Sequence, residues 1–189
     1  MSLANEYQDE YREEILNGKK VLMSPRPRIN HIRAGRAILR IFDRYFRGNP
    51  CEVFYEPDVQ LTKKDLIVPD IAIVCNKDII EDNIINGPPD LIAEILSPAT
   101  SRRDRGYKKR LYEKCGIKEY WIVDVDSRII EVHLLTSGKY LTVDYYELLP
   151  DWELEDMTEQ ERAAYIYEFK THLFEDLIID IREVFEDIE

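Results

Sequence analysis

Residues 89–109, PDLIAEILSPATSRRDRGYKK, contain the pattern that decides the fold. The apolar run from Leu91 to Leu96 predicts a buried strand, and a single carboxylate, Glu94, interrupts it. Side chains alternate between the two faces of a strand, and both faces are otherwise apolar here, which is typical of a strand covered on both sides. A buried carboxylate is costly without a partner, so Glu94 needs a base, a hydrogen-bond donor or a metal ion.

A basic helix is expected directly after this strand, from about Ser101 to Lys114. At about 100° per residue, its large apolar side chains occupy one arc, and Lys108 and Asp104 fall inside that arc. Lys108 is therefore expected to face inward, toward a carboxylate or a phosphate. The alternative is that its stem packs on the core while its ammonium group reaches solvent.

A second acid, Asp70, interrupts the apolar run LIVPDIAIV at residues 66–74, which predicts a further strand. If the two strands are neighbours, Asp70 and Glu94 converge, and a divalent cation would relieve their repulsion. Oxygen ligands suit Mg²⁺ or Mn²⁺ better than zinc. The alternative is that Glu94 pairs with an arginine of the following helix, and spacing alone does not separate the two.

The rest of the chain predicts an α/β (α+β) fold with a mixed, strand-rich core and two main helices, in a single domain of residues 1–189. Asn17-Gly18 predicts an N-terminal β-hairpin. An amphipathic helix is expected near residues 30–46, with Asn30 as its cap. The other expected elements are a helix start at 4–12, strands at 51–56, 58–62, 118–126, 128–135, 139–148 and 176–181, and a helix at 159–170.

The charge pattern is uneven along the chain. The net charge of −12 argues against a nucleic-acid binder, because such proteins are usually basic. The segment from Ser101 to Lys118, however, holds eight basic and two acidic residues, while the segment from Asp151 to the end holds 14 acidic and three basic residues. A local basic patch matters more to an anionic ligand than the total charge does.

The cysteines and the apolar runs indicate the cellular compartment in which the protein is expected. Cys51, Cys75 and Cys115 are odd in number, far apart and without CxxC spacing, which favours a reducing cytoplasm and disfavours a zinc site. The chain has no apolar run of the roughly 18 residues that a membrane-spanning helix needs, and its acidic first residues do not form a signal peptide. We therefore expect a cytoplasmic protein without a membrane partner.

The order of these motifs resembles the Uma-type family of restriction endonucleases, within the PD-(D/E)XK nuclease superfamily. Asp70 closes VPD and precedes Glu94 by 24 residues. LSPAT at 96–100, RRDRGYK at 102–108 and KEYWIVD at 118–124 then follow in the family's order, and EEILNGKKVLMSPRPRINH at 13–31 and HLFEDLIIDIREVF at 172–185 resemble its opening and closing segments.

The resemblance implies a restriction-endonuclease-like mixed β-sheet flanked by helices, and a Mg²⁺- or Mn²⁺-dependent phosphodiesterase acting on nucleic acid, with DNA the first expectation. Asp70 and Glu94, with the Ile95 backbone carbonyl, would hold the metal. The superfamily lysine would fall on Leu96, which departs from the pattern, but the Uma-type family resembles this chain in placing its lysine on the following helix, at Lys108. The family also implies a homodimer.

Further residues are expected around this site. Glu14 and His31 match auxiliary positions of the family, although a histidine at a helix start is also common as a surface or capping residue, and Asp104 follows from the inward arc. Arg102, Arg103 and Arg105 would position backbone phosphates. Two alternatives remain open: a non-catalytic binding module on a nuclease fold, and a metal-dependent phosphoesterase of small molecules.

Overall fold

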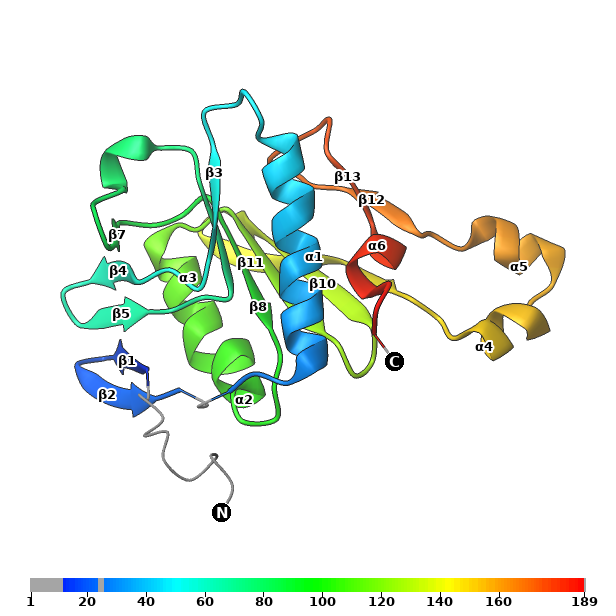
Figure 1. The fold of residues 1–189 in the computed structure, drawn as a ribbon, viewed down its shortest axis with the longest axis horizontal. Helices are drawn as coiled ribbons and strands as arrows, with labels where there is room; N and C mark the ends of the chain where they lie inside the picture. Colours follow the sequence, from blue (N-terminus) through cyan, green and yellow to red (C-terminus); the bar gives the residue numbers. More distant parts are fainter. Residues whose placement is uncertain (1–11, 24–25, 189) are drawn as a thin grey trace, which may run out of the picture.

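A six-stranded mixed sheet forms the centre of the protein, in a computed structural model that describes residues 12–23 and 26–188. The helix start expected at residues 4–12 lies, apart from Arg12, outside this range. The strand order is β11-β10-β9-β8-β6-β3 (Figure 1). Its strands are β3 (Glu52–Tyr55), β6 (Ile71–Val74), β8 (Leu91–Ile95), β9 (Glu119–Asp124), β10 (Ile129–Thr136) and β11 (Lys139–Glu147).

A smaller sheet carries the N-terminal hairpin, in the order β2-β1-β5-β4-β7. Its strands are β1 (Glu13–Leu16), β2 (Lys19–Leu22), β4 (Val59–Thr62), β5 (Asp65–Ile67) and β7 (Ile85–Asn86). The predicted turn is confirmed: Asn17 and Gly18 both have positive φ, at 51° and 74°, as a tight hairpin of this kind requires. Strands β12 (Glu168–Lys170) and β13 (Ile178–Asp180) pair separately.

Helices cover both faces of the central sheet. Helix α1 (Ile29–Tyr45) is the predicted amphipathic helix, but the predicted cap is wrong, because Arg28 holds the N-cap position and Asn30 lies inside the first turn. The basic helix is confirmed in three parts, α2 (Ser101–Arg103), the π-helical turn η3 (Asp104–Lys108) and α3 (Lys109–Cys115). The remaining helical segments are η2 (Lys77–Ile79), α4 (Asp151–Asp156), α5 (Glu159–Ala164) and α6 (Ile181–Phe185).

The predicted helix of residues 159–170 is wrong in its second half. Helix α5 ends at Ala164, and Glu168–Lys170 instead pairs with β13, which buries Phe169 in the core. Tertiary pairing therefore overrides the local helix propensity of this segment. In Figure 1, α4 and α5 extend away from the rest of the chain.

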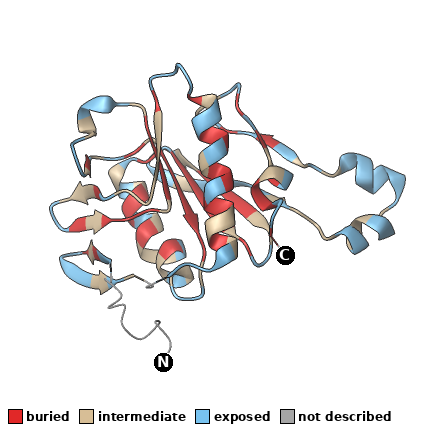
Figure 2. Ribbon diagram, in the orientation of Figure 1, coloured by how far each residue is buried: buried red, intermediate tan, exposed pale blue. Residues whose placement is uncertain are grey.

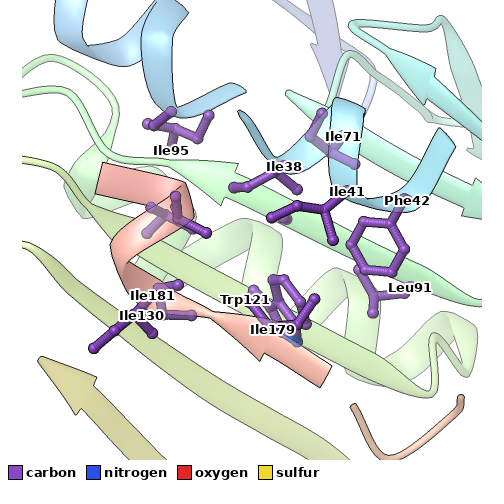
Figure 3. Packing of buried hydrophobic residues seen from close by; sticks show 14 of the residues in the cluster. Ile38, Ile41, Phe42, Ile71, Leu91, Ile95, Trp121, Ile130, Ile179 and Ile181 are labelled. Carbon is purple, nitrogen blue, oxygen red and sulfur yellow. The ribbon is translucent and has the colours of Figure 1, made fainter. Parts of the chain in front are cut away.

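Two apolar clusters lie on opposite faces of the central sheet, because successive side chains of its strands alternate between them. One cluster packs the sheet against α1, α6 and β12–β13, and its rings include Phe42 and Trp121 at 5.5 Å between centroids (Figure 3). The other packs it against α3 and the smaller sheet. Figure 2 shows the buried residues concentrated in these layers, with α4 and α5 exposed. No helix within the described residues is long and apolar enough to cross a membrane.

The expected continuous strand at residues 66–74 is divided. Strand β5 ends at Ile67 and belongs to the smaller sheet, while β6 begins at Ile71 and belongs to the central one. Pro69 lies between them, and proline cannot donate the ladder hydrogen bond that a continuous strand would need. Asp70 is therefore the residue immediately before β6.

Cys51 and Cys75 form a disulfide bond at the end of the β3–β6 ladder. The ladder pairs Glu52 with Val74, so the next pair outward is Cys51 opposite Cys75. This register is a tertiary property, which is why the wide spacing of the cysteines gave no sign of it. The argument for a reducing cytoplasm therefore does not hold for these two residues, while Cys115 is a free cysteine.

We expect the double variant Cys51→Ser/Cys75→Ser to lose about 2–4 kcal/mol of unfolding free energy, because the bond closes a loop between residues 24 positions apart. Urea denaturation followed by tryptophan fluorescence measures the loss. A reducing agent should lower the stability of the wild type but leave the double variant unchanged, and Cys115→Ser serves as the control. Equal stability of wild type and double variant in oxidising buffer would contradict the pairing.

Candidate active site

Strand register brings three acids into one row at the end of the central sheet. Strands β6 and β8 pair Ile71 with Ala93, so one step further along the register Asp70 lies opposite Glu94. The β3–β6 ladder likewise places Glu56 opposite Asp70, and the Glu56 backbone N–H donates to the Asp70 carbonyl at 2.9 Å. Asp70 contacts His31 on α1 and Glu94 contacts Tyr112 on α3, and both acids line one pocket. The convergence of Asp70 and Glu94 predicted from the sequence is therefore present.

Lys108 is buried and faces this row, with a side-chain exposure of 4%. Its Nζ lies 2.7 Å from Glu14 Oε1, 3.0 Å from Glu94 Oε1 and 3.7 Å from Asp104 Oδ1. Burial alone would lower the pKa of Lys108, but the charges of Glu94, Glu14 and Asp104 outweigh it and raise that pKa above its usual value. The ammonium group is thus charged and does not reach solvent, so the alternative of an outward-directed lysine does not apply.

Glu94 points toward α3 from the middle of the sheet. Its Oε1 accepts hydrogen bonds from Lys108 Nζ and from the buried Tyr112 hydroxyl. Burial raises the pKa of Glu94 well above its usual value; Lys108 opposes this, and the nearby charges of Asp104, Asp70 and Glu14 add to it. The expected alternative, an arginine partner for Glu94, is replaced by this lysine and tyrosine.

Asp70 is held between β8 and α1. Its Oδ2 accepts a hydrogen bond of 2.7 Å from the Ile95 backbone N–H, and its Oδ1 lies 3.3 Å from His31 Nε2. Burial lowers the pKa of His31, but hydrogen bonding to Asp70, the Asp70 charge and the Ile95 carbonyl together raise it above its usual value. His31 is buried rather than a surface cap, and it contacts Asp70 and Ile95, two of the three residues that the resemblance assigns to the metal.

Glu14 reaches the cluster from the smaller sheet. Its Oε1 accepts from the Val68 backbone N–H at 3.1 Å as well as facing Lys108, and its Oε2 accepts from Arg103 at 3.1 Å. Glu14 therefore ties β1 to the loop before Asp70 and to the helical segment, so that the hairpin closes one side of the cluster.

Asp104 lies on the same helical segment as Lys108, one turn earlier. The inward position predicted for both residues is confirmed, since both are buried. Burial raises the pKa of Asp104, against the opposing charge of Lys108 and a hydrogen bond from Thr100. Among the described residues, Asp104 Oδ1 and His31 Nδ1 are buried without a hydrogen-bond partner.

The cluster opens into a pocket of about 320 Å³. The sequence-predicted residues that line it are Glu14, His31, Asp70, Glu94, Ile95, Arg103, Asp104 and Lys108. The other two predicted arginines lie elsewhere: Arg102 lines a neighbouring hollow, and Arg105 pairs with Glu131 on β10. The structure thus gathers all of the predicted acids, the lysine and the histidine, and one of the three arginines.

Two residues of the site were missed in the sequence. Glu56 lines the pocket and pairs with Arg12, but it lies in a turn after β3, and only the β3–β6 register relates it to Asp70. Tyr112 falls in the inward arc of its helix, where its size indicates packing, and nothing in the spacing indicates that its hydroxyl would donate to Glu94.

A divalent metal ion would find few protein ligands in this pocket. Among residues 12–23 and 26–188, no three His, Cys, Asp or Glu side chains are placed to bind one ion together. Mg²⁺ in phosphoryl-transfer sites is commonly bound by only one or two carboxylates, with water and substrate oxygens completing its shell. Asp70 and Glu94 supply two such carboxylates in one pocket, and Asp104 and His31, which also line it, each keep a buried polar atom without a hydrogen-bond partner. The residues fit this mode of binding.

Comparison with known proteins adds two similarities. A family named Uma2, described as "Putative restriction endonuclease", matches residues 3–165. A crystal structure from Anabaena variabilis, described as "a putative nuclease belonging to DUF820", matches with a TM-score of 0.67 and 18% sequence identity, covering 97% of this chain and 94% of the other. No curated protein matches the chain. At this identity, the structural similarity shows the fold, which is the nuclease-like mixed fold predicted from the sequence.

Proposed function

We propose, from the premise that this chain belongs to the Uma2 family described as "Putative restriction endonuclease", that it is a divalent-metal-dependent nuclease hydrolysing phosphodiester bonds of nucleic acid. One observation carries the proposal. Lys108 is buried against Glu94 and Glu14, in the same pocket as Asp70. A buried lysine surrounded by carboxylates at a pocket is typical of a site built for charge stabilisation, and it supports an active enzyme over a non-catalytic module on the same fold.

The main residues of the site have defined tasks in this proposal. Asp70 and Glu94, with the Ile95 carbonyl, would hold Mg²⁺ or Mn²⁺, which supplies a polarised phosphate and a water of lowered pKa when bound. Lys108 would orient the attacking water or stabilise charge on the phosphorane. His31 keeps Asp70 in place through Nε2, and Tyr112 keeps Glu94 in place through its hydroxyl.

The proposed substrate is DNA, and the proposed assembly is a homodimer of single-domain chains. A nuclease that cuts both strands of a duplex needs two sites, and a symmetric pair of chains supplies them. Arg26, Arg28 and Arg103 line the pocket, where their guanidinium groups would contact a bound phosphate.

The direct test is an assay of the purified wild type on single-stranded DNA, duplex DNA, RNA and a small phosphodiester. We expect cleavage of polynucleotide that stops with a chelator and returns with Mg²⁺ or Mn²⁺. The activity should elute with the protein on size-exclusion chromatography, which controls for contaminating nuclease. Turnover of the small phosphodiester alone would contradict the proposal and favour a small-molecule phosphoesterase.

A further inference from the structure

A groove runs away from the candidate pocket along one side of the α2–η3–α3 segment. A hollow of about 580 Å³ shares Ala99 and Arg103 with the pocket, and a further hollow of about 570 Å³ shares Tyr107 and Arg110 with the first. These shared residues join the two hollows to the pocket end to end. We call this surface the basic groove, defined by Lys64, Arg102, Gly106, Tyr107, Arg110 and Lys114.

The bases of the groove differ from the other bases of the same segment. Arg103, Arg105 and Lys108 are committed to carboxylates. In the part of the chain that the structure describes, no ion pair involves the exposed groove bases Lys64, Arg102, Arg110 and Lys114. Four basic side chains without an ion pair therefore line one surface of a chain whose net charge is −12, although Lys114 is close enough to Asp65 to help lower the pKa of that carboxyl group.

The spacing of these bases suits a polyanion. Arg102, Gly106, Arg110 and Lys114 follow at intervals of four residues, and all four line the two adjoining hollows. The position without a base is Gly106, where an added Cβ would meet nothing within 4 Å. The groove is thus a row of positive charges with an open floor between them, as binding of a phosphate backbone requires.

An aromatic ring lies in the middle of this row. Tyr107 lines both hollows, and its hydroxyl donates to Asp65 Oδ1 at 2.6 Å. Asp65 is the acid of the groove, and it also accepts from the Asn17 backbone N–H and the Thr62 hydroxyl. Its charge is therefore used within the protein, and it fixes the orientation of the Tyr107 ring. Basic side chains that alternate with an oriented aromatic ring are typical of surfaces that bind single-stranded nucleic acid.

From these contacts we propose that the basic groove binds the sugar–phosphate backbone of the nucleic-acid strand that leads into the pocket, with one nucleobase stacked on the Tyr107 ring. The claim that the bound strand leads toward the pocket rests on the proposed nuclease function. The inference assigns backbone binding to Arg102, Arg110, Lys114 and Lys64, of which only Arg102 was expected from the sequence.

The test is binding of a fluorescently labelled oligonucleotide, single-stranded or duplex, measured by anisotropy in the presence of a chelator so that no cleavage occurs. The variant is Arg102→Glu/Arg110→Glu/Lys114→Glu. The matched control is Arg36→Glu/Arg47→Glu/Lys170→Glu, which makes the same charge change at exposed residues of α1, the turn after it and β12.

We expect the groove variant to lose about a hundredfold in affinity at low salt, and the slope of log K against log salt to become shallower by about 2 for single strands. The control should lose less than about threefold. Tyr107→Ala should weaken single-strand binding by about tenfold, while Tyr107→Phe retains it. A loss confined to the single-stranded probe assigns the groove to a single strand, and an equal loss on the duplex assigns it to one strand of a duplex.

Three outcomes overturn the inference: no binding of either probe by the wild type, equal losses in the groove and control variants, or an unchanged salt slope in the groove variant. The nuclease proposal fails separately. If the wild type binds oligonucleotide through the groove but cleaves it with no metal, the nuclease proposal fails and the groove proposal stands. If the wild type cleaves nucleic acid but the groove variant keeps the wild-type affinity for the oligonucleotide, the groove proposal fails and the nuclease proposal stands.

Discussion

Lys108→Met is expected to lower the unfolding free energy at neutral pH by about 3–5 kcal/mol, because it leaves buried carboxylates without their counter-charge. Lys108 is the shared partner of Glu14, Glu94 and Asp104, and its own side chain is almost fully buried. Methionine keeps the volume of the stem, so the loss measures the charge rather than a cavity. Urea denaturation followed by the fluorescence of the buried Trp121 gives the value.

The loss should depend on pH in a defined direction. The pKa values of Glu94 and Asp104 are raised in the folded protein, and Lys108 is the group that restrains both. Without Lys108 these two pKa values rise further. A carboxyl group whose pKa is raised in the folded state contributes stability at pH values below its unfolded-state pKa. That contribution is lost as the pH rises through its folded-state pKa. The variant should therefore approach wild-type stability near pH 4 and fall away from it toward pH 7.

Two further variants control this measurement. Lys114→Met removes an exposed lysine of the same helix and should change the unfolding free energy by less than about 0.5 kcal/mol. Glu94→Gln/Lys108→Met should recover part of the loss, because one of the uncompensated charges is gone. A Lys108→Met protein as stable as the wild type at pH 7 would show that the ammonium group does not hold this cluster together.

Glu94→Gln is expected to reduce metal-dependent cleavage by roughly a thousandfold or more, which is about 4 kcal/mol of transition-state stabilisation. Glutamine keeps the shape of the side chain and an oxygen for the Tyr112 hydroxyl, so the fold should be retained. The negative charge that would bind the cation is lost. Cleavage rates at saturating Mg²⁺, and Mn²⁺ binding followed by electron paramagnetic resonance, measure the two consequences independently.

The matched control is Glu131→Gln. Glu131 is also a buried acid of the central sheet and also pairs with a base of the helical segment, Arg105, but it does not line the pocket. It should retain cleavage and Mn²⁺ binding within about threefold. Persistent cleavage by rigorously purified Glu94→Gln protein would remove Glu94 from the site, and equal losses in both variants would indicate a general effect on the sheet.

The sequence predicted those parts of the site that depend on local periodicity. The period of two in β8 identified Glu94 as an acid inside a core strand, and the helical arc identified Lys108 and Asp104 as inward-facing. Both predictions succeeded because amphipathic patterning is a strong local signal of burial. The N-terminal hairpin was also predictable, since Asn17-Gly18 encodes a specific turn.

The features that were missed depend on strand register. Cys51 opposite Cys75 and Glu56 opposite Asp70 follow from the β3–β6 ladder, which joins segments that no local pattern relates. The division of residues 66–74 between two sheets has the same origin. Counting charges along the sequence did not show which basic residues of the segment 101–118 are ion-paired. In the structure, some of them pair with carboxylates while others line the basic groove.

The π-helical turn η3 separates the helix after Glu94 into two parts, and it sets the rotation of the side chains of α2 relative to those of α3. Its hydrogen bonds span one residue more than those of an α-helix, so it acts as a single inserted residue between α2 and α3. Removing one residue there would rotate Asp104 and Arg103 relative to Leu111 and Tyr112 by about 100°. Chain length within this turn is therefore a determinant of the pocket in its own right, separate from the identity of any side chain that lines it.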